Sequence, residues 1–565
     1  MVRQLIQKTW IAWLLITGLT VLVYANTVSY EMLHNYDDDV YFKDSSISEL
    51  NVPHIKAYFS DYYLGMYQPL PVLSMAFLNS ITPEEIKIQR WANILLHCIN
   101  TLLVLLLIKK ITGNTLVGIF TALFFAIHPM HVESVTWLAT RSNLMFSLFY
   151  LSALLAYSHW QDNRKALFWM CMFVCFVLAL FCKVTAATLP AVLLLLDWYK
   201  GRKFDKVDFF LYLPLFFLSG IFIWLGVQAS TAFGHITEMG QTYSFYERII
   251  LLFHALWLYL YKFIVPIHQS VIYLFPFKEN GSLPAITIYS AMLSLLCLAA
   301  MLLASWKMLK HKKEKALLFG ILFFLITISI VMPLKWLRTV IIAERYTYVP
   351  YIGLTAGLLL VLFNFAKEKG TILRNIFISL LLAYCLIFSF QSFQRNKVWE
   401  NPITLFTDVI EKDGGRAEKS MGYYNRGNEY FRMHDATNAI ADYSNAVEIY
   451  PDYTEAYYNR GLVYYNVDEN DAAIADFSRA IELKSSFIDA YINRSSAYRK
   501  AGKYESALED LNKAIELHPN ALAYLGRGVL FFTNLDNPEQ ACTDWNIAAQ
   551  MGSEQAKQLL LLYCK

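Results

Sequence analysis

The sequence has few charged residues: Asp, Glu, Lys and Arg make up 16% of its 565 residues, whereas 56% are hydrophobic. A soluble globular domain carries about 25% charged residues, so this composition excludes one and indicates an integral membrane protein. The net charge of +3 is close to neutral and gives no indication of nucleic-acid binding. Long apolar runs fill residues 1–398, whereas residues 415–565 have the composition of a soluble helical array.

Cysteine patterns that would indicate a metal centre are also lacking. Cys171 and Cys175 are one helical turn apart, but no His or second Cys pair accompanies them. Cys542 and Cys564 lie in the soluble part, where they can form a disulfide if that part faces an oxidising compartment. The other cysteines fall in apolar runs and are typical of packing. No cleaved signal peptide is evident, because the first apolar run is long enough to span a membrane and lacks a clear cleavage site.

Apolar runs of about 15 to 22 residues predict eleven membrane spans. The predicted spans are 10–28, 90–108, 115–129, 143–159, 166–182, 184–198, 208–226, 287–306, 316–333, 350–366 and 372–391. Basic clusters between them belong on the cytoplasmic side. Their alternation requires that 248–265 does not cross, so we interpret it as an interfacial or re-entrant helix.

This topology places several loops and the C-terminal domain together on the extracytoplasmic face. The loops are 29–89, 129–142, 227–286 and 334–349. The chain therefore divides into a membrane domain at 1–398, a linker at 399–420 and a repeat domain at 421–565.

A repeat with a period of 34 residues fills the C-terminal part. Tyr423-Tyr424-Asn425-Arg426-Gly427 recurs in related form from Tyr457, Tyr491 and Tyr524. The period and its small residues resemble tetratricopeptide repeats, which predicts four helical hairpins followed by a capping helix and an all-α fold for the chain. Two roles stay open for the Asn-Arg pairs: they line a concave face and bind a peptide acceptor, or they brace neighbouring repeats. The pairs are Asn425, Arg426, Asn459, Arg460, Asn493 and Arg494.

Polar residues gather in the extracytoplasmic loops. The first loop opens with Asp37-Asp38-Asp39, a solvated turn or a catalytic carboxylate group. Each of the other residues could be a satisfied interfacial side chain, but together they fit a site for an anionic lipid head group. They are His128, His131, Glu133, Arg141, Lys183, Glu344 and Arg345, with Asp44, Lys335 and Arg338 nearby. The His and Glu spacing suits a metal, yet a third ligand is not identifiable, so we predict none.

Five motifs occur in order along the chain. They are Asn35-Tyr36-Asp37-Asp38-Asp39, Tyr67-Gln68-Pro69-Leu70, the run from His128 to Trp137 with Arg141, Lys183 with Leu189-Pro190 through Leu196-Asp197, and the run from Ala343 to Pro350. With the repeats, they resemble the transmembrane and tetratricopeptide-repeat O-mannosyltransferase family and its bacterial relatives. That family is similar to the GT-C class of glycosyltransferases, which take a sugar from a polyprenyl or dolichyl phosphate on the non-cytoplasmic face.

The resemblance implies an inverting transfer of a hexose such as mannose to a hydroxyl of an extracytoplasmic acceptor, namely Ser or Thr of a protein. It maps the family's acidic pair onto Asp37 and Asp38 and leaves Asp39 without a role. Gln68 stands where relatives often have Arg, which weakens a charge role there. The resemblance further implies a polyprenyl-phosphate donor and no metal or other cofactor. Frequent Ile, Lys and Asn favour a bacterial inner-membrane protein with a periplasmic repeat domain.

Two alternatives remain at this point. A membrane-anchored repeat scaffold without catalysis would keep the array and need none of the carboxylates. A transporter of lipid-linked saccharides would place polar residues near the middle of the membrane, whereas this chain concentrates them at one face.

Overall fold

The computed structural model describes most of the chain. The described residues are 9–34, 36–42, 47, 50–82, 85–203, 206–233, 237–238, 243–276, 278, 281–310, 315–333, 336–337, 340–412 and 415–564. Asn35, Asp44, Lys335 and Arg338 lie outside these residues. The chain divides into two compact units, Met1–Leu405 and Phe406–Lys565.

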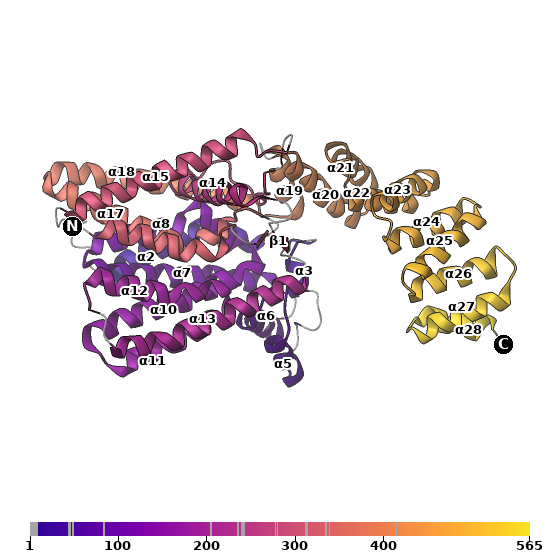
Figure 1. Ribbon diagram of the computed structural model, residues 1–565, viewed down its shortest axis with the longest axis horizontal. Helices are drawn as coiled ribbons and strands as arrows, with labels where there is room; N and C mark the ends of the chain where they lie inside the picture. The colour runs from indigo at the N-terminus through magenta and orange to yellow at the C-terminus, as the bar shows by residue number, and fades with distance from the viewer. Residues whose placement is uncertain are drawn as a thin grey trace. The chain divides into compact units, whose positions relative to one another are not determined.

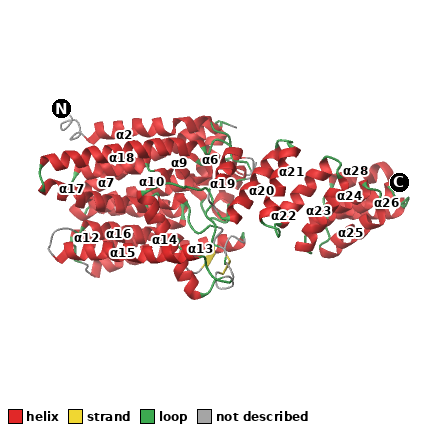
Figure 2. Cartoon of the chain, turned by 90° about the horizontal axis from the view of Figure 1, so that it is seen from above, coloured by secondary structure: helices red, strands yellow, loops and turns green. Residues whose placement is uncertain are grey.

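The first unit is a bundle of helices (Figures 1 and 2). Its elements are α2 (Thr9–Tyr24), η1 (Ala25–Ser29), α3 (Asp38–Phe42), α5 (Val52–Ser60), α6 (Pro69–Ile81), α7 (Ile86–Thr112), α8 (Thr115–Ile127), η2 (Pro129–His131), α9 (Val132–Thr136), η3 (Leu138–Thr140), α10 (Arg141–Asn163), α11 (Ala166–Cys182), η4 (Val184–Thr188), α12 (Leu189–Lys200), α13 (Lys206–Ala232), β1 (Thr237–Glu238), α14 (Phe245–Ile264), α15 (Ala285–Lys310), α16 (Ala316–Ile328), η6 (Ser329–Val331), β2 (Trp336–Leu337), η7 (Glu344–Thr347), α17 (Pro350–Glu368) and α18 (Thr371–Lys397).

Helix ends and close approaches follow from particular residues. Gly113 ends α7 in the left-handed region, with φ of +68°, and Asn114 then caps α8 by accepting from the amides of Leu116 and Val117. Gly320 of α16 lies against Gly353 of α17, where a Cβ would clash with the carbonyl oxygen. Lipid tails are as apolar as the helix surfaces, so no hydrophobic driving force brings helices together in a membrane. Small residues instead let the helices approach closely and gain packing contacts.

Six helices of the described residues are long and apolar enough to cross a membrane, and they match six of the eleven predicted spans. They are Thr9–Ser29, Ile86–Thr112, Asp208–Ala232, Ala285–Lys310, Pro350–Glu368 and Thr371–Lys397. A seventh arises if α8 and the segment Pro129–Thr136, which bend by 58°, are one broken span. The other predicted spans fall on the helices α10, α11, α12 and α16, and their crossing stays a prediction. Helix α14 is not among these candidates either, and its interfacial or re-entrant placement stays a prediction.

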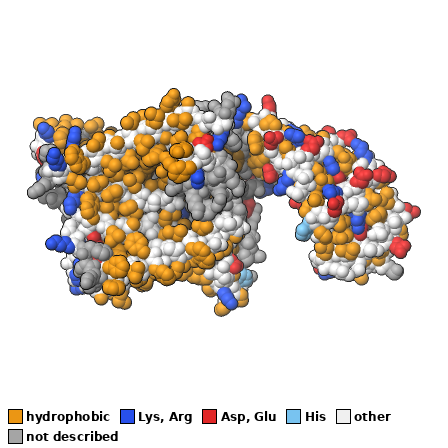
Figure 3. All heavy atoms as spheres, in the orientation of Figure 1, with side chains coloured by type: hydrophobic (Ala, Val, Ile, Leu, Met, Phe, Trp, Pro, Cys, Tyr) orange, Lys and Arg blue, Asp and Glu red, His pale blue; other side chains and the backbone are white. Residues whose placement is uncertain are grey.

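Exposed hydrophobic side chains cover the flank of the bundle in one view (Figure 3). At one end of the bundle lie α3, α5, α6 and β1, and the N-terminal end of α2 lies at the other (Figure 1). The strands β1 and β2 form a single antiparallel pair in the described residues, with Thr237 opposite Leu337. The all-α fold class is thus confirmed, with this short pair as its one departure in that part of the chain.

The second unit is the repeat array. It contains α20 (Arg416–Arg432), α21 (Ala436–Ile449), α22 (Thr454–Asn466), α23 (Asn470–Leu483), α24 (Ile488–Lys500), α25 (Tyr504–Leu517), α26 (Ala521–Thr533), α27 (Pro538–Gln550) and α28 (Glu554–Tyr563). Three of the four hairpins pack a glycine against a ring: a Cβ on Gly427 would lie 2.9 Å from Tyr443, and Gly461 and Gly528 face Phe477 and Trp545 in the same way. The predicted hairpins and capping helix are present.

The predicted linker 399–420 contains α19 (Pro402–Glu411) and the first residues of α20. Thr407 of α19 accepts a hydrogen bond from Arg426 of the first hairpin at 2.9 Å. Ser444 and Ser478 accept from Arg460 and Arg494 in the same manner. The part of α19 that contains Thr407 therefore takes the place that the second helix of a preceding hairpin would have.

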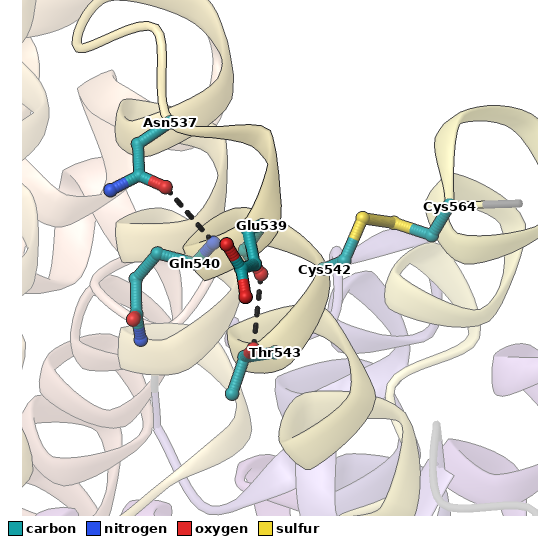
Figure 4. The surroundings of a disulfide bond; sticks show 6 residues. All are labelled: Asn537, Glu539, Gln540, Cys542, Thr543 and Cys564. Carbon is teal, nitrogen blue, oxygen red and sulfur yellow. Dashed lines mark hydrogen bonds between the residues drawn. A yellow bond between two sulfur atoms is a disulfide. The ribbon is translucent and has the colours of Figure 1, made fainter.

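A disulfide joins Cys542 of α27 to Cys564, directly after α28 (Figure 4). Their Cα atoms are 5.7 Å apart. At the start of the same helix, the side chain of Asn537 caps it by accepting from the amide of Gln540. The bond fixes the capping helix to the last hairpin.

Candidate functional site

The three adjacent aspartates have three different surroundings. Asp38, in the first turn of α3, is fully buried and accepts from the amides of Leu33 at 3.2 Å and Ala139 at 3.1 Å. Burial raises the pKa of Asp38 to about 6, although Arg90 and these amides act in the opposite direction. Its two oxygens tie the acidic loop to the start of η3.

Asp37 and Asp39 are more accessible. Asp37 is half-buried, and its charge acts on Asp38 and on Tyr41. Asp39 lies 2.8 Å from Nδ1 of His34, and 29% of its side chain is exposed. Within the triplet, Asp37 is therefore the carboxylate that lies close to the buried charges and still has part of its surface accessible to a substrate.

Two aromatic rings connect the acidic loop with Arg345. The ring of Tyr36 lies 4.7 Å from that of Trp137, and the guanidinium of Arg345 lies 5.3 Å from the Trp137 ring. Trp399 stacks on Trp137 at 5.8 Å. Residues separated by about 300 positions in sequence thus meet around one indole.

Arg345 is held by Glu133. The backbone amide of Arg345 donates to Glu133 at 2.7 Å, and its guanidinium forms an ion pair with the same carboxylate. Burial alone would lower the pKa of Arg345, but Glu133 more than offsets this and raises it. The side chain keeps 23% of its surface exposed, so Arg345 remains a charged group that a ligand can reach.

A small cavity lies beside Arg345. It is lined by Asn143, Phe146, Lys183, Thr185, Thr327, Val331, Arg345, Tyr346, Tyr348, Val349 and Pro350. Lys183 donates to the side-chain oxygen of Asn143 and lies 5.4 Å from the Tyr346 ring. The cavity volume of about 20 Å³ is room for about one water molecule. The described lining thus brings two predicted cations, Lys183 and Arg345, to one cavity.

The two predicted histidines contact backbone carbonyls. His128 accepts from the amide of Met130 at 3.2 Å and donates to the carbonyl of Phe263 at 3.1 Å. His131 lies 2.9 Å from the carbonyl of Phe125. Both are buried and support the bend between α8 and α9, and a role in binding substrate stays a prediction. Among the described residues, no group of three or more His, Cys, Asp or Glu could hold a metal, and metal independence also stays a prediction.

Arg141 and Glu344 are buried and are not among the described lining residues of the cavity. Arg141 donates to the side chain of Asn93 at 2.9 Å and to the carbonyl of Gln89 at 2.8 Å. Glu344 accepts from the hydroxyl of Tyr273 at 2.9 Å. These contacts give both residues a supporting place around the site, and their direct contact with a phosphate stays a prediction.

Several members of the site are not among the residues predicted from the sequence. Arg90 of α7 is buried, donates to the carbonyl of Thr136 at 2.9 Å and acts on Asp38. Asn143 and Tyr346 line the cavity. Arg90 carries a signal, because a charged residue at the start of an apolar span marks a functional position by default. Asn143 has the weaker signal of a polar residue inside such a run.

The arginines of the repeats form two-pronged ion pairs with aspartates of the same hairpin. Arg426 pairs with Asp442, and Arg460 pairs with Asp476 at 2.8 and 2.7 Å. Arg494 and Arg527 repeat the arrangement with Asp510 and Asp544. Asn459 and Asn493 donate to tyrosine hydroxyls of the preceding hairpin, whereas Asn425 donates to the carbonyl of Met421. These contacts favour the bracing role, and acceptor binding by the Asn-Arg pairs stays a prediction.

The fold and the site define a membrane protein with several apolar helices, a polar site near one end of them and a tetratricopeptide-repeat domain. The family model described as "TPR repeat" matches residues 427–468, and the one described as "Tetratricopeptide repeat" matches residues 454–487 and 488–520.

Among curated proteins, the chain is 25% identical over 449 residues to human "Protein O-mannosyl-transferase TMTC1", covering 69% of this chain and 48% of that protein. It is 32% identical over 130 residues to Drosophila melanogaster "Protein O-mannosyl-transferase Tmtc1", covering 22% of this chain and 14% of that protein. The chain thus spans about half the length, or less, of these relatives. They confirm the resemblance to the transmembrane and tetratricopeptide-repeat family that the motifs indicate.

Among solved structures, the chain is similar to "Crystal structure of MamA", with 25% identity and a TM-score of 0.25, covering 27% of this chain and 89% of that one.

Proposed function

We propose that the chain is a membrane glycosyltransferase that moves a hexose, such as mannose, from a polyprenyl-phosphate donor to a Ser or Thr hydroxyl of an extracytoplasmic protein. The observation that carries this proposal is the cavity with Lys183 and Arg345, joined to the acidic loop through Tyr36 and Trp137. The names of the curated relatives support the same chemistry.

Asp37 acts as the general base. It takes the proton of the acceptor hydroxyl while that oxygen attacks the anomeric carbon from the face opposite the phosphate. The bond between the anomeric carbon and the phosphate oxygen breaks, and the electron pair leaves with the polyprenyl phosphate. The configuration at the anomeric carbon is therefore inverted.

Lys183 and Arg345 stabilise the leaving phosphate. A phosphate is already a stable anion, so it needs cationic contacts rather than a proton, and positively charged donors in a partly buried site are effective there. Glu133 fixes Arg345 through both its amide and its guanidinium. Asp38 holds the loop that carries Asp37, because both of its oxygens accept backbone amides.

The repeats bind the polypeptide acceptor, and the chain resides in a bacterial inner membrane with the repeats in the periplasm. Three observations support this arrangement: the distribution of basic loops, the disulfide of the array, and the position of α3, α5 and β1 at one end of the bundle. Disulfides persist in oxidising compartments such as the periplasm.

The test compares Asp37→Asn with the matched change Asp39→Asn in purified protein reconstituted in nanodiscs. The donor is undecaprenyl-phosphate mannose, and the acceptors are Ser- and Thr-containing peptides, with transfer read by mass spectrometry. A general base contributes about 10²–10⁴-fold, so Asp37→Asn should lower kcat by at least about 100-fold and leave the donor KM within about threefold. Asp39→Asn should retain most activity.

Full activity in Asp37→Asn would refute the base assignment. Absence of transfer in the wild type, together with loss of a bound protein partner on changing the array, would instead support the membrane-anchored scaffold.

A further inference from the structure

Lys262 is a buried cation near the end of α14, with 3% of its surface exposed. Its ammonium donates to the carbonyl oxygens of Ile267 at 3.1 Å and His268 at 2.9 Å, and lies 5.2 Å from the Tyr273 ring. A buried ammonium is unfavourable unless its donors are satisfied. The chain after α14 folds back over the end of the helix and thereby supplies the two carbonyl oxygens that accept hydrogen bonds from Lys262.

The turn that Lys262 closes is strained at His268. This residue has a φ of +50°, in the left-handed region that side chains with a Cβ disfavour. Such conformations persist where surrounding contacts impose them, and they gather at functional sites. The ammonium of Lys262 binds the carbonyl of His268 itself, so it stabilises the backbone at the strained residue.

Residues just beyond this turn reach Glu344. The side-chain amide of Gln269 donates to one carboxylate oxygen of Glu344 at 3.3 Å, and the Tyr273 hydroxyl donates to the other at 2.9 Å. The carbonyl of Tyr273 also accepts from the amide of Ile341 at 2.8 Å. Arg395 of α18 lies 3.5 Å from Glu344. The loop thus fixes the segment 341–344 at two separate points.

That segment leads directly into η7, which carries Arg345 and Tyr346 of the cavity. Glu344 also holds η7 internally, because its carbonyl accepts from the Thr347 hydroxyl at 2.7 Å. Glu133 fixes Arg345 from the side of α9. Arg345 is therefore held in place by two groups of contacts, those with Glu133 and those with the loop that Lys262 closes.

We propose that Lys262 is a positioning residue for the phosphate-binding cation. By closing the strained turn at His268, it places Gln269 and Tyr273 on Glu344 and so sets the position of Arg345 and Tyr346. This inference rests on the proposed function, because it assigns the purpose of the arrangement to binding of a lipid monophosphate.

The experiment compares Lys262→Met with Lys278→Met in the full chain in nanodiscs. Lys278 is a matched control, because it lies 5.5 Å from the Tyr243 ring and pairs with Glu247 at 3.0 Å but keeps 30% of its side chain exposed. Three readouts are taken: hydrogen exchange of peptides covering 341–348, affinity for undecaprenyl phosphate, and donor KM against kcat. Tyr273→Phe is a second variant that retains the ring and removes only the hydroxyl that binds Glu344.

In Lys262→Met, we expect exchange of 341–348 to rise by about tenfold, since the segment loses the bond from the Ile341 amide to Tyr273 and the contacts of Gln269 and Tyr273 with the Glu344 carboxylate. We also expect undecaprenyl phosphate affinity to fall, and donor KM to rise, by about tenfold or more, because small displacements of a binding group are costly. Tyr273→Phe should show smaller changes in the same direction, and Lys278→Met should show none.

Unchanged exchange and affinity in both Lys262→Met and Tyr273→Phe, or equal effects in Lys278→Met, would overturn the inference. If Lys262→Met does not fold, Tyr273→Phe decides. If the wild type binds undecaprenyl phosphate but transfers no sugar, the proposed function fails, while exchange and affinity still decide on Lys262.

Discussion

Three adjacent aspartates of identical chemistry differ because the chain buries them differently. Asp38 is enclosed and its oxygens are occupied by two amides, Asp39 faces His34, and Asp37 is half-buried. A proton acceptor must be within reach of its substrate, so occupied oxygens are a disadvantage for Asp38. Its contacts instead fit a residue that holds the loop.

The buried state of Asp38 predicts a pH-dependent stability difference. Its pKa is about 6 in the folded protein against an ordinary value of 3.8. Because the folded form binds the proton more tightly, the free energy of unfolding that Asp38 contributes falls as the pH rises from about 4 to about 6, and is constant above about 7. The wild type should therefore gain about 2 kcal/mol relative to Asp38→Asn on going from pH 7 to pH 4.

Thermal unfolding of both proteins in detergent, from pH 4 to pH 8, measures this difference. Stability curves that stay parallel across the range would contradict the buried, raised pKa of Asp38. Asp39→Asn, at a partly exposed site, provides the control.

At the scale of elements, the repeats show what a regular pattern encodes. Arg460 and Asp476 are 16 residues apart, as are Arg426 and Asp442, so the period places both partners of each ion pair at fixed positions in the hairpin. The pairing could thus be predicted from spacing, together with the helices. The choice between bracing and peptide binding could not, because it depends on which side chains the tertiary packing buries.

Irregular elements were less predictable for a related reason. Apolar runs identify helices, yet the 58° bend between α8 and the following segment and the strained turn at His268 depend on contacts between distant residues. Arg141 and Arg345 have similar sequence settings beside predicted spans. Asn93 and Gln89 bury the first, whereas the second reaches the cavity. No local pattern distinguishes the two.

The ion pairs of the array predict unequal costs of substitution. Arg460→Met leaves Asp476 without its partner at a site where 8% of the carboxylate side chain is exposed, and removal of one partner of a buried pair costs about 3–5 kcal/mol. Lys500→Met removes an exposed pair with Asp468, in which the carboxylate is 77% exposed, and should cost about 1 kcal/mol or less.

Hydrogen exchange of array peptides in the full chain, across a urea series, measures both losses. Adding Asp476→Leu to Arg460→Met should restore part of the stability, because it removes the unpaired buried charge. Equal costs at the two sites would show that the two-pronged pair does not brace the hairpin.

The whole molecule combines a membrane unit and a repeat array, and the predicted topology assigns the site and the array to one compartment. Basic loops flank the cytoplasmic ends of the predicted spans, and the disulfide Cys542–Cys564 requires an oxidising environment to persist. The proposed topology places the acidic loop and the repeats on the same side of the membrane. A glycosyltransferase acting on a protein acceptor requires this arrangement, since donor phosphate, base and acceptor must meet on one face.

This topology predicts the labelling of two exposed lysine positions after each is changed to cysteine. Lys56 lies on α5 in the first predicted external loop, and Lys165 lies between α10 and α11 in a predicted cytoplasmic loop. A membrane-impermeant maleimide added to intact spheroplasts should label Lys56→Cys fully and label Lys165→Cys only after the membrane is opened. Without reductant, Cys542 and Cys564 should stay unlabelled, because they are bonded to each other. Labelling of Lys165→Cys in intact spheroplasts would reverse the topology and move the acidic loop, and with it the proposed transfer, to the cytoplasmic face.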